Sequence, residues 1–152
     1  MSEAGWEISH SVETATSREF AWSYMTKVAN WDDPPAEFKL EGAFAEGSRG
    51  RTLVPGQAPR EWVIRRVDEG ASYTLEFPLD GATMSFEWTF AGIAEGRTRL
   101  TQRVMLAGKN AAAYLKQVKP AFTASLAPGM EKIAKAIGRA AAEGAAERPP
   151  DN

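Results

Sequence analysis

The chain has 152 residues, a formal net charge of -2 and no cysteine. This length fits a single domain, and the nearly balanced charge argues against a nucleic-acid-binding protein. The lack of cysteine excludes disulfides and thiolate chemistry, and it fits a cytoplasmic location. No stretch approaches the roughly 20 apolar residues of a membrane-spanning helix, and the first residues lack the basic and apolar regions of a signal peptide.

The N-terminal part predicts a strand followed by a short helix. Residues 6–12 alternate between two faces, because side chains in a strand point to opposite sides in turn. One of these faces carries Trp6, Ile8, His10 and Val12. Thr16 and Glu19 have capping-box spacing, which predicts a helix start. The helix that follows would place Phe20, Tyr24 and Val28 on one side, and it should end in Asn30–Pro35 because residues before proline avoid helical angles.

The middle of the chain predicts an antiparallel sheet. Six alternating segments are separated by glycine-containing turns, and we expect strands near residues 37–42, 49–54, 60–68, 72–78, 82–92 and 97–107. Asp80-Gly81 and Glu95-Gly96 lie between long alternating runs, which is typical of hairpins. The strand at 82–92 has the most pronounced apolar row, formed by Met84, Phe86, Trp88 and Phe90.

The last of these strands has one apolar face and one charged face. Its charged face carries Arg97, Arg99 and Arg103, which we expect on the solvated side, within reach of Glu87 for cross-strand ion pairs. Gln102 lies among apolar residues on the other face. A buried amide without partners costs about 1–3 kcal/mol, so Gln102 either orients a polar group of a ligand or binds the backbone of a bulge.

The C-terminal part predicts one long amphipathic helix. Apolar residues recur at steps of three and four, which indicates a helical stripe. The stripe consists of Leu115, Val118, Phe122, Leu126, Met130, Ile133 and Ile137. Pro120 and Pro128 predict a bent or segmented helix, because an interior proline removes a backbone hydrogen bond. We expect residues 1–147 to form a single domain and residues 148–152 to be a frayed polar tail.

The order of these elements, with several short motifs, resembles a known superfamily. Val12–Trp22 looks like its opening strand and first helix, Asn30-Trp31 like its tryptophan after that helix, and Arg97–Gly108 like its last strand. Met130–Ile133 looks like the closing part of its helix, and Pro55–Trp62 like one branch of uncharacterised bacterial members. The chain thus resembles the SRPBCC superfamily, also called START/Bet v 1-like or polyketide cyclase/dehydratase-like proteins.

The resemblance implies an α+β helix-grip fold, in which a curved antiparallel sheet of about seven strands wraps around a long C-terminal helix. It implies a pocket but no particular reaction, because the superfamily has no shared catalytic motif. Its members bind lipids, sterols, polyketides or plant hormones, and a minority catalyse cyclisation or dehydration.

The leading hypothesis is that a hydrophobic small molecule, such as a lipid, a polyketide or an aromatic compound, binds between the sheet and the C-terminal helix. The apolar row and the helical stripe would face each other across a hollow, and small-molecule sites are mostly apolar with a few polar groups. Each aromatic residue also fits a role in the core. The predicted lining is Trp62, Ile64, Tyr73, Leu75, Phe77, Met84, Phe86, Trp88, Gln102, Val118, Phe122 and Leu126.

Two alternatives stay open. In the first, the same cavity hosts a cyclase- or dehydratase-like reaction with His10, the single histidine, as catalytic base; a half-buried structural histidine is the plainer interpretation. In the second, the helix or the loop at 55–62 docks a partner protein and there is no ligand. One histidine and no cysteine argue against a zinc site, and we expect no metal and no cofactor.

Overall fold

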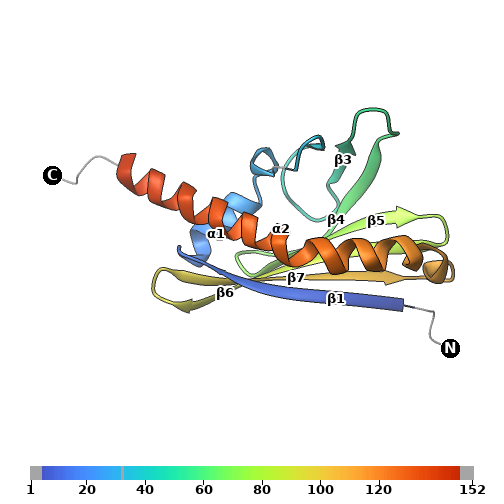
Figure 1. Ribbon diagram of the computed structural model, residues 1–152. Coiled ribbons are helices and arrows are strands. Elements are labelled where there is room, and N and C mark those ends of the chain that lie inside the picture. Colours follow the sequence, from blue (N-terminus) through green and yellow to red (C-terminus); the bar gives the residue numbers. More distant parts are fainter. Residues whose placement is uncertain (1–4, 32, 148–152) are drawn as a thin grey trace.

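One seven-stranded antiparallel sheet and one long helix dominate the computed structural model, which describes residues 5–31 and 33–147 (Figure 1). The strands run in the order β1-β7-β6-β5-β4-β3-β2. The elements are β1 (Gly5–Thr14), α1 (Arg18–Met25), the 3-10 helix η1 (Val28–Asn30), β2 (Glu37–Leu40), β3 (Arg49–Leu53), β4 (Arg60–Asp68), β5 (Ser72–Leu79), β6 (Ala82–Ala94), β7 (Arg97–Ala107) and α2 (Ala111–Glu147). The predicted helix-grip architecture is confirmed.

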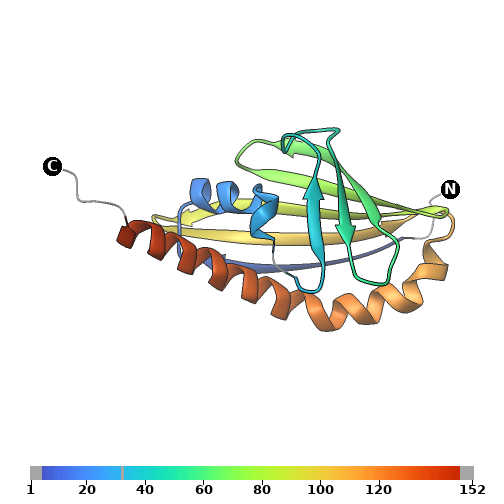
Figure 2. The ribbon, with the colours of Figure 1, turned by 90° about the horizontal axis from the view of Figure 1, so that it is seen from above.

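The sheet curves around α2, which lies closest to one of its edges. Figures 1 and 2 both show α2 running beside β1, while β2, β3 and β4 rise on the other side of the molecule. The contacts agree, because α2 packs chiefly on β1 and more lightly on β7 and α1. The short helix α1 also packs on the concave face, where its Trp22 contacts Tyr73 of β5 and Phe90 of β6.

The helix α2 is a single uninterrupted element, so of the two predicted forms, bent or segmented, the structure shows the bent one. Pro120 and Pro128 both lie inside it, and Figure 2 shows the helix curving along its length instead of breaking. Curvature is the usual response to an interior proline. Although α2 has 37 residues, no helix in the described part of the chain is long and apolar enough to span a membrane.

The helix α1 is shorter than predicted, and its most deeply buried residues differ from the predicted Phe20 and Tyr24, which are partly buried against the core. Its N-cap is Ser17, whose hydroxyl oxygen accepts a hydrogen bond from the Phe20 N–H at 3.2 Å. Thr16, the predicted cap, instead uses its carbonyl oxygen to accept a hydrogen bond from the Thr98 hydroxyl at 2.8 Å. The residues that α1 buries are Ala21, Trp22 and Met25. The helix ends at Met25, so the predicted row of Phe20, Tyr24 and Val28 does not form within it.

The arginines of β7 form ion pairs on the outer face of the sheet, but their main acidic partners are on β1 and are not the predicted Glu87. Arg103 donates to both carboxylate oxygens of Glu7 on β1, at 2.5 and 3.1 Å. Arg97 donates to Glu13 at 3.1 Å. The predicted partner Glu87 lies opposite Arg103 in the register and contributes to raising its pKa, although less than Glu7 does. The edge strand β1 thus supplies the carboxylates that pair with the arginines of β7.

The pair between Glu7 and Arg103 predicts a pH- and salt-dependent contribution to stability. The hydrogen bond from Arg103 lowers the pKa of the Glu7 carboxyl, so the contribution is present at neutral pH and is lost as the pH falls through that lowered pKa. We expect Glu7→Gln to lower the thermal midpoint slightly at pH 7 in low salt. The difference should disappear in acid below that lowered pKa, where the carboxyl is protonated, and in about 1 M salt, because salt screens exposed pairs. A difference that persisted under both conditions would contradict an electrostatic origin.

Candidate functional site

The twelve predicted ligand-binding residues fall into two environments. Six are at most 6% exposed and belong to the core: Trp62, Ile64, Tyr73, Leu75, Trp88 and Leu126. The other six are partly exposed: Phe77, Met84, Phe86, Gln102, Val118 and Phe122. Only the second group offers side-chain surface to a ligand without rearrangement of the core. We call the five apolar members of this group, Phe77, Met84, Phe86, Val118 and Phe122, the apolar contact set.

The buried group is held by protein contacts alone. The Trp62 indole donates to the Thr52 hydroxyl at 3.1 Å, and its ring lies 5.5 Å from that of Trp31. The Tyr73 ring packs against Phe44 and Phe90, with centroids 5.0 and 6.0 Å apart. Burial raises the pKa of Tyr73 far above its ordinary value, so its hydroxyl stays protonated. These aromatic residues fill the core, which is the alternative to ligand contact that the sequence predicts for them.

The apolar contact set lies where β5, β6 and α2 converge. The rings of Phe77 and Phe86 are 5.2 Å apart, and the rings of Phe86 and Phe122 are 5.7 Å apart. Met84 is the cross-strand neighbour of Phe77. The sheet and α2 therefore touch at the Phe86–Phe122 contact, and no hollow separates these two rings.

His10 and Gln102 lie next to each other on the inner face of the sheet. They are directly paired in the register between β1 and β7, and Gln102 is paired with Trp88 on its other side. Leu100 and Val104, the neighbours of Gln102 on the same face of β7, are 0% exposed. Gln102 is nevertheless partly exposed. The side chain of Gln102 is therefore less completely covered than those of its two neighbours, although it lines neither of the two hollows described below.

The sequence offers two explanations for an amide at position 102 on the inner face, contact with a ligand or with the backbone of a bulge. The pairing of β7 with both neighbours is regular at this residue, and the irregularity between β6 and β7 lies at Gly92–Ala94. Among the described residues, no hydrogen bond joins the side chain of Gln102 or of His10 to another group of the protein. The bulge explanation for Gln102 finds no support among the described residues, and contact with a ligand stays a prediction.

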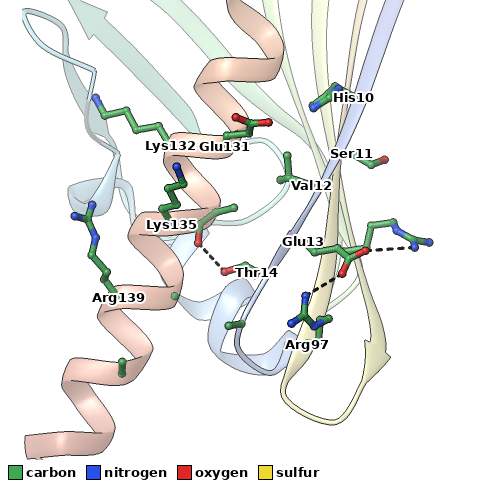
Figure 3. A pocket seen from close by; sticks show the side chains of 15 residues that line it. His10, Ser11, Val12, Glu13, Thr14, Arg97, Glu131, Lys132, Lys135 and Arg139 are labelled. Atoms are coloured by element: carbon green, nitrogen blue, oxygen red, sulfur yellow. Dashed lines mark hydrogen bonds and ion pairs between the residues drawn. The ribbon is translucent and has the colours of Figure 1, made fainter.

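A broad, open hollow of about 960 Å³ lies between β1 and α2 (Figure 3). One wall is formed by consecutive residues of β1 and the turn after it, His10 to Ala15, and the other wall by one side of α2, from Glu131 to Ala142. At its narrow end the Thr14 hydroxyl donates to the Ala134 carbonyl oxygen at 2.7 Å. Of the predicted site residues, His10 alone lines this hollow.

The hollow has more basic than acidic lining residues, of which Arg97, Arg99 and Glu13 reach it from the outer face of the sheet and the others from α2. Its basic lining residues are Arg97, Arg99, Lys132, Lys135 and Arg139, whereas its acidic ones are Glu13 and Glu131. Glu13 is already paired with Arg97 and Arg99. A second hollow of about 420 Å³ lies between the start of α1 and the β6–β7 turn, and it contains none of the predicted site residues.

Comparison with known proteins finds similarity in the fold alone. No family model and no curated protein sequence matches the chain. Norcoclaurine synthase from Thalictrum flavum, solved in complex with dopamine and hydroxybenzaldehyde, superposes with a TM-score of 0.70 at 16% identity, covering 98% of this chain and 91% of that one. Ara h 8.0201 gives a TM-score of 0.62 at 15% identity, with coverage of 89% and 96%.

A third similar structure is the di-domain ARO/CYC protein BexL, from the BE-7585A biosynthetic pathway. Its TM-score is 0.63 at 16% identity, and the match covers 88% of this chain but 45% of that one. This chain therefore corresponds to about one of the two domains. At such identities the likeness establishes a common architecture, and the site must be argued from its own residues.

Proposed function

Because the chain adopts the helix-grip fold of the Bet v 1-like superfamily, we propose that it binds a hydrophobic small molecule between the sheet and the first half of α2 (residues 111–124). The observation that carries this proposal is the apolar contact set. It brings Phe77 of β5, Phe86 of β6 and Phe122 of α2 into contact, with Met84 opposite Phe77. Val118 packs on the neighbouring smaller cluster, which Met84 also contacts. Such a surface is typical of ligand sites, which are concave and mostly apolar.

A ligand enters this site by displacing the ring of Phe122 from that of Phe86. The helix allows this movement because Val118 and Phe122 are only partly buried, whereas Met130 and Ile137 in its second half (residues 125–144) are 1% and 0% exposed. Burial of one aliphatic or aromatic group contributes about 1.5–3 kcal/mol. Two or three such groups therefore give affinities in about the micromolar range after the cost of association.

The similar structures support an aromatic ligand in particular. The norcoclaurine synthase structure holds dopamine and hydroxybenzaldehyde, which are compounds with one aromatic ring. In this chain, the centroid of the Phe86 ring lies 5.2 Å from that of Phe77 and 5.7 Å from that of Phe122. Aromatic pairs gain about 0.5–1.5 kcal/mol beyond simple area burial, so a ring inserted among them would be favoured over an alkyl chain of equal area.

Fluorescence titration with 1-anilinonaphthalene tests the proposal. We expect saturable binding by the wild-type protein and about tenfold weaker binding by Phe86→Ala, which removes the ring at the centre of the site. Ile93→Ala is the matched control, because Ile93 is a large apolar residue of β6 that is 37% exposed and lies outside the set. Absence of saturable binding, or equal losses in the two variants, would contradict the proposal. Native mass spectrometry of freshly purified protein would then look for the natural ligand.

A second candidate function is a cyclase- or dehydratase-like reaction in the same site. The pairing of His10 with Gln102 favours it, since an imidazole could remove a proton beside a carbonyl group while the amide donates to the enolate oxygen. His10→Ala should then abolish turnover and leave the fold intact, and unchanged turnover would end this version. No observation favours the third hypothesis, a protein-interaction module, because Ile93 is the one large apolar side chain that is exposed in the described residues.

A further inference from the structure

We propose that the ligand carries a carboxylate and that His10 and Gln102 bind this group. The inference rests on the proposed function, because it places the apolar body of the same ligand against the apolar contact set. It extends that function by naming the chemical class of the ligand, an aromatic carboxylic acid. It also gives the open hollow between β1 and α2 a role as the polar end of the site.

The sheet register places the two polar side chains beside the apolar contact set. On β6 and β7 the pair Trp88–Gln102 is two residues from the pair Phe86–Val104, and His10 is the next partner across the sheet. Two residues along a strand span about 7 Å. This is about the distance from the far edge of an aromatic ring to the carboxylate that it carries. Gln102 is also one strand away from Phe86 and His10 two strands away, at about 4.8 Å per strand, so their backbone positions lie about 8 Å and about 12 Å from that of Phe86. A ligand whose ring lies on Phe86 therefore meets Gln102 first, and the inward side chain of His10 must cover the remaining distance to its carboxylate.

Both side chains have hydrogen-bonding groups to offer. They lie on an otherwise apolar face, with Leu100 and Val104 on β7 and Val12 on β1 packed in or against the core. A polar group in such surroundings is costly unless it finds a partner. The Gln102 amide and a ring N–H of His10 are both donors, and they lie on adjacent strands. Two adjacent donors match the two oxygen atoms of one carboxylate.

The charge of the hollow selects an acid over an amine. His10 lies on its wall across from the helix residues Lys132, Lys135 and Arg139, which outnumber the acidic Glu131, whereas Arg97, Arg99 and Glu13 reach the hollow from the outer face of the sheet (Figure 3). Because Glu13 is engaged by Arg97 and Arg99, Glu131 is the acidic lining residue that stays without an ion pair among the described residues. An excess of basic side chains around a hollow attracts anions and repels cations. A ligand with an ammonium group would meet this repulsion.

Calorimetric titration with 2-naphthoate and its methyl ester tests the inference, because the two probes share one apolar body and differ in charge. We expect the wild-type protein to bind the acid at least about tenfold more tightly, the typical effect of a hydrogen bond to a charged group. Gln102→Met, which keeps the size of the side chain, and His10→Leu should each reduce this preference and leave the affinity for the ester unchanged. Ser9→Ala is the control, since Ser9 is on the outer face of β1 beside His10.

The outcomes separate the two proposals. Equal affinity of the wild-type protein for acid and ester overturns the carboxylate inference and leaves the proposed function standing. The carboxylate inference is likewise overturned if both variants keep the preference for the acid, or if 2-naphthylmethylamine binds more tightly than 2-naphthoate. If none of the three probes binds saturably, both proposals are overturned together.

Discussion

Replacement of Trp62 by Ala should lower the free energy of unfolding by about 3–5 kcal/mol, the usual cost of removing a large aromatic side chain from a core. Trp62 is 2% exposed. Its ring packs beside those of Trp31 and Phe77, at 5.5 and 6.3 Å, and its indole N–H donates to Thr52. The loss is a large part of the total stability of a domain of this size, which is about 5–15 kcal/mol.

The neighbour of Trp62 on β3 makes this prediction sharper. Gly50 is its cross-strand partner, and a Cβ atom added to Gly50 would overlap the six-membered ring of Trp62. Gly50→Ala should therefore destabilise the protein by about 1–3 kcal/mol through overpacking. In Trp62→Leu the ring is absent, so the same Gly50→Ala change should cost much less. The two residues should thus show a strong coupling energy in a double-mutant cycle.

Urea denaturation of the four proteins of this cycle measures the coupling energy, and the same measurement on Trp62→Ala gives the first predicted loss. Gly56→Ala is a useful comparison, because Gly56 has a positive φ of 81° but nothing within 4 Å of an added Cβ. Its cost would come from backbone strain alone and should not depend on Trp62. If Trp62→Ala cost less than about 1 kcal/mol, or if the Gly50→Ala cost were equal with and without the ring, the packing described for this part of the core would be incorrect.

The sequence predicts the sheet well because strands and hairpins leave local signals. Side-chain alternation identifies each strand and its inner face, and Trp88 and Phe90 are buried as their alternation predicts. Turn glycines mark the hairpins: Gly81 and Gly96 have φ values of 73° and 69°, which favour glycine. The β5–β6 and β6–β7 pairs follow from these turns. All of this information is carried by residues close together in the chain.

The position of α2 on the sheet leaves no such local signal. A helical stripe shows which side of the helix is buried but not which strand it covers. That choice depends on contacts such as the hydrogen bond from Thr14 to Ala134, between residues 120 positions apart. The hollow between β1 and α2 is created by the same placement. The sequence therefore could not show that basic residues such as Lys132 and Lys135 line a hollow together with His10.

The sequence also gives no indication of how deeply each residue of the inner face is buried. Alternation places Leu100, Gln102 and Val104 on one face and treats them alike, yet Leu100 and Val104 are fully buried and Gln102 is partly exposed. The difference depends on what α2 covers above each residue. For the same reason the sequence could not separate the core residues of the predicted site from those that a ligand can reach. Residues 148–152, predicted to be a frayed tail, lie outside the described residues.

Replacement of Ile137 by Ala should cost about 2–5 kcal/mol, whereas Val118→Ala should cost about 1 kcal/mol or less. Both residues belong to the apolar stripe of α2. Ile137 is 0% exposed and belongs to the main core, while Val118 is partly exposed and packs against the smaller cluster that includes Leu106. Chemical denaturation gives both values, and equal losses in the two variants would contradict the division of α2 into an anchored half and a freer half.

This division matters for function because the two halves of α2 contribute differently to binding. The second half is fixed by Met130, Ile137 and the hydrogen bond between Thr14 and Ala134, so it sets the position of the hollow beside His10. The first half carries Val118 and Phe122, which must yield to a ligand. We expect amide hydrogens of residues 112–122 to exchange faster than those of residues 130–140 in the free protein. Addition of 2-naphthoate should slow exchange chiefly in the first half, because a bound ligand stabilises the segment that closes over it. Slowing confined to the second half would place the ligand elsewhere and exclude Phe122 as the residue that moves to admit it.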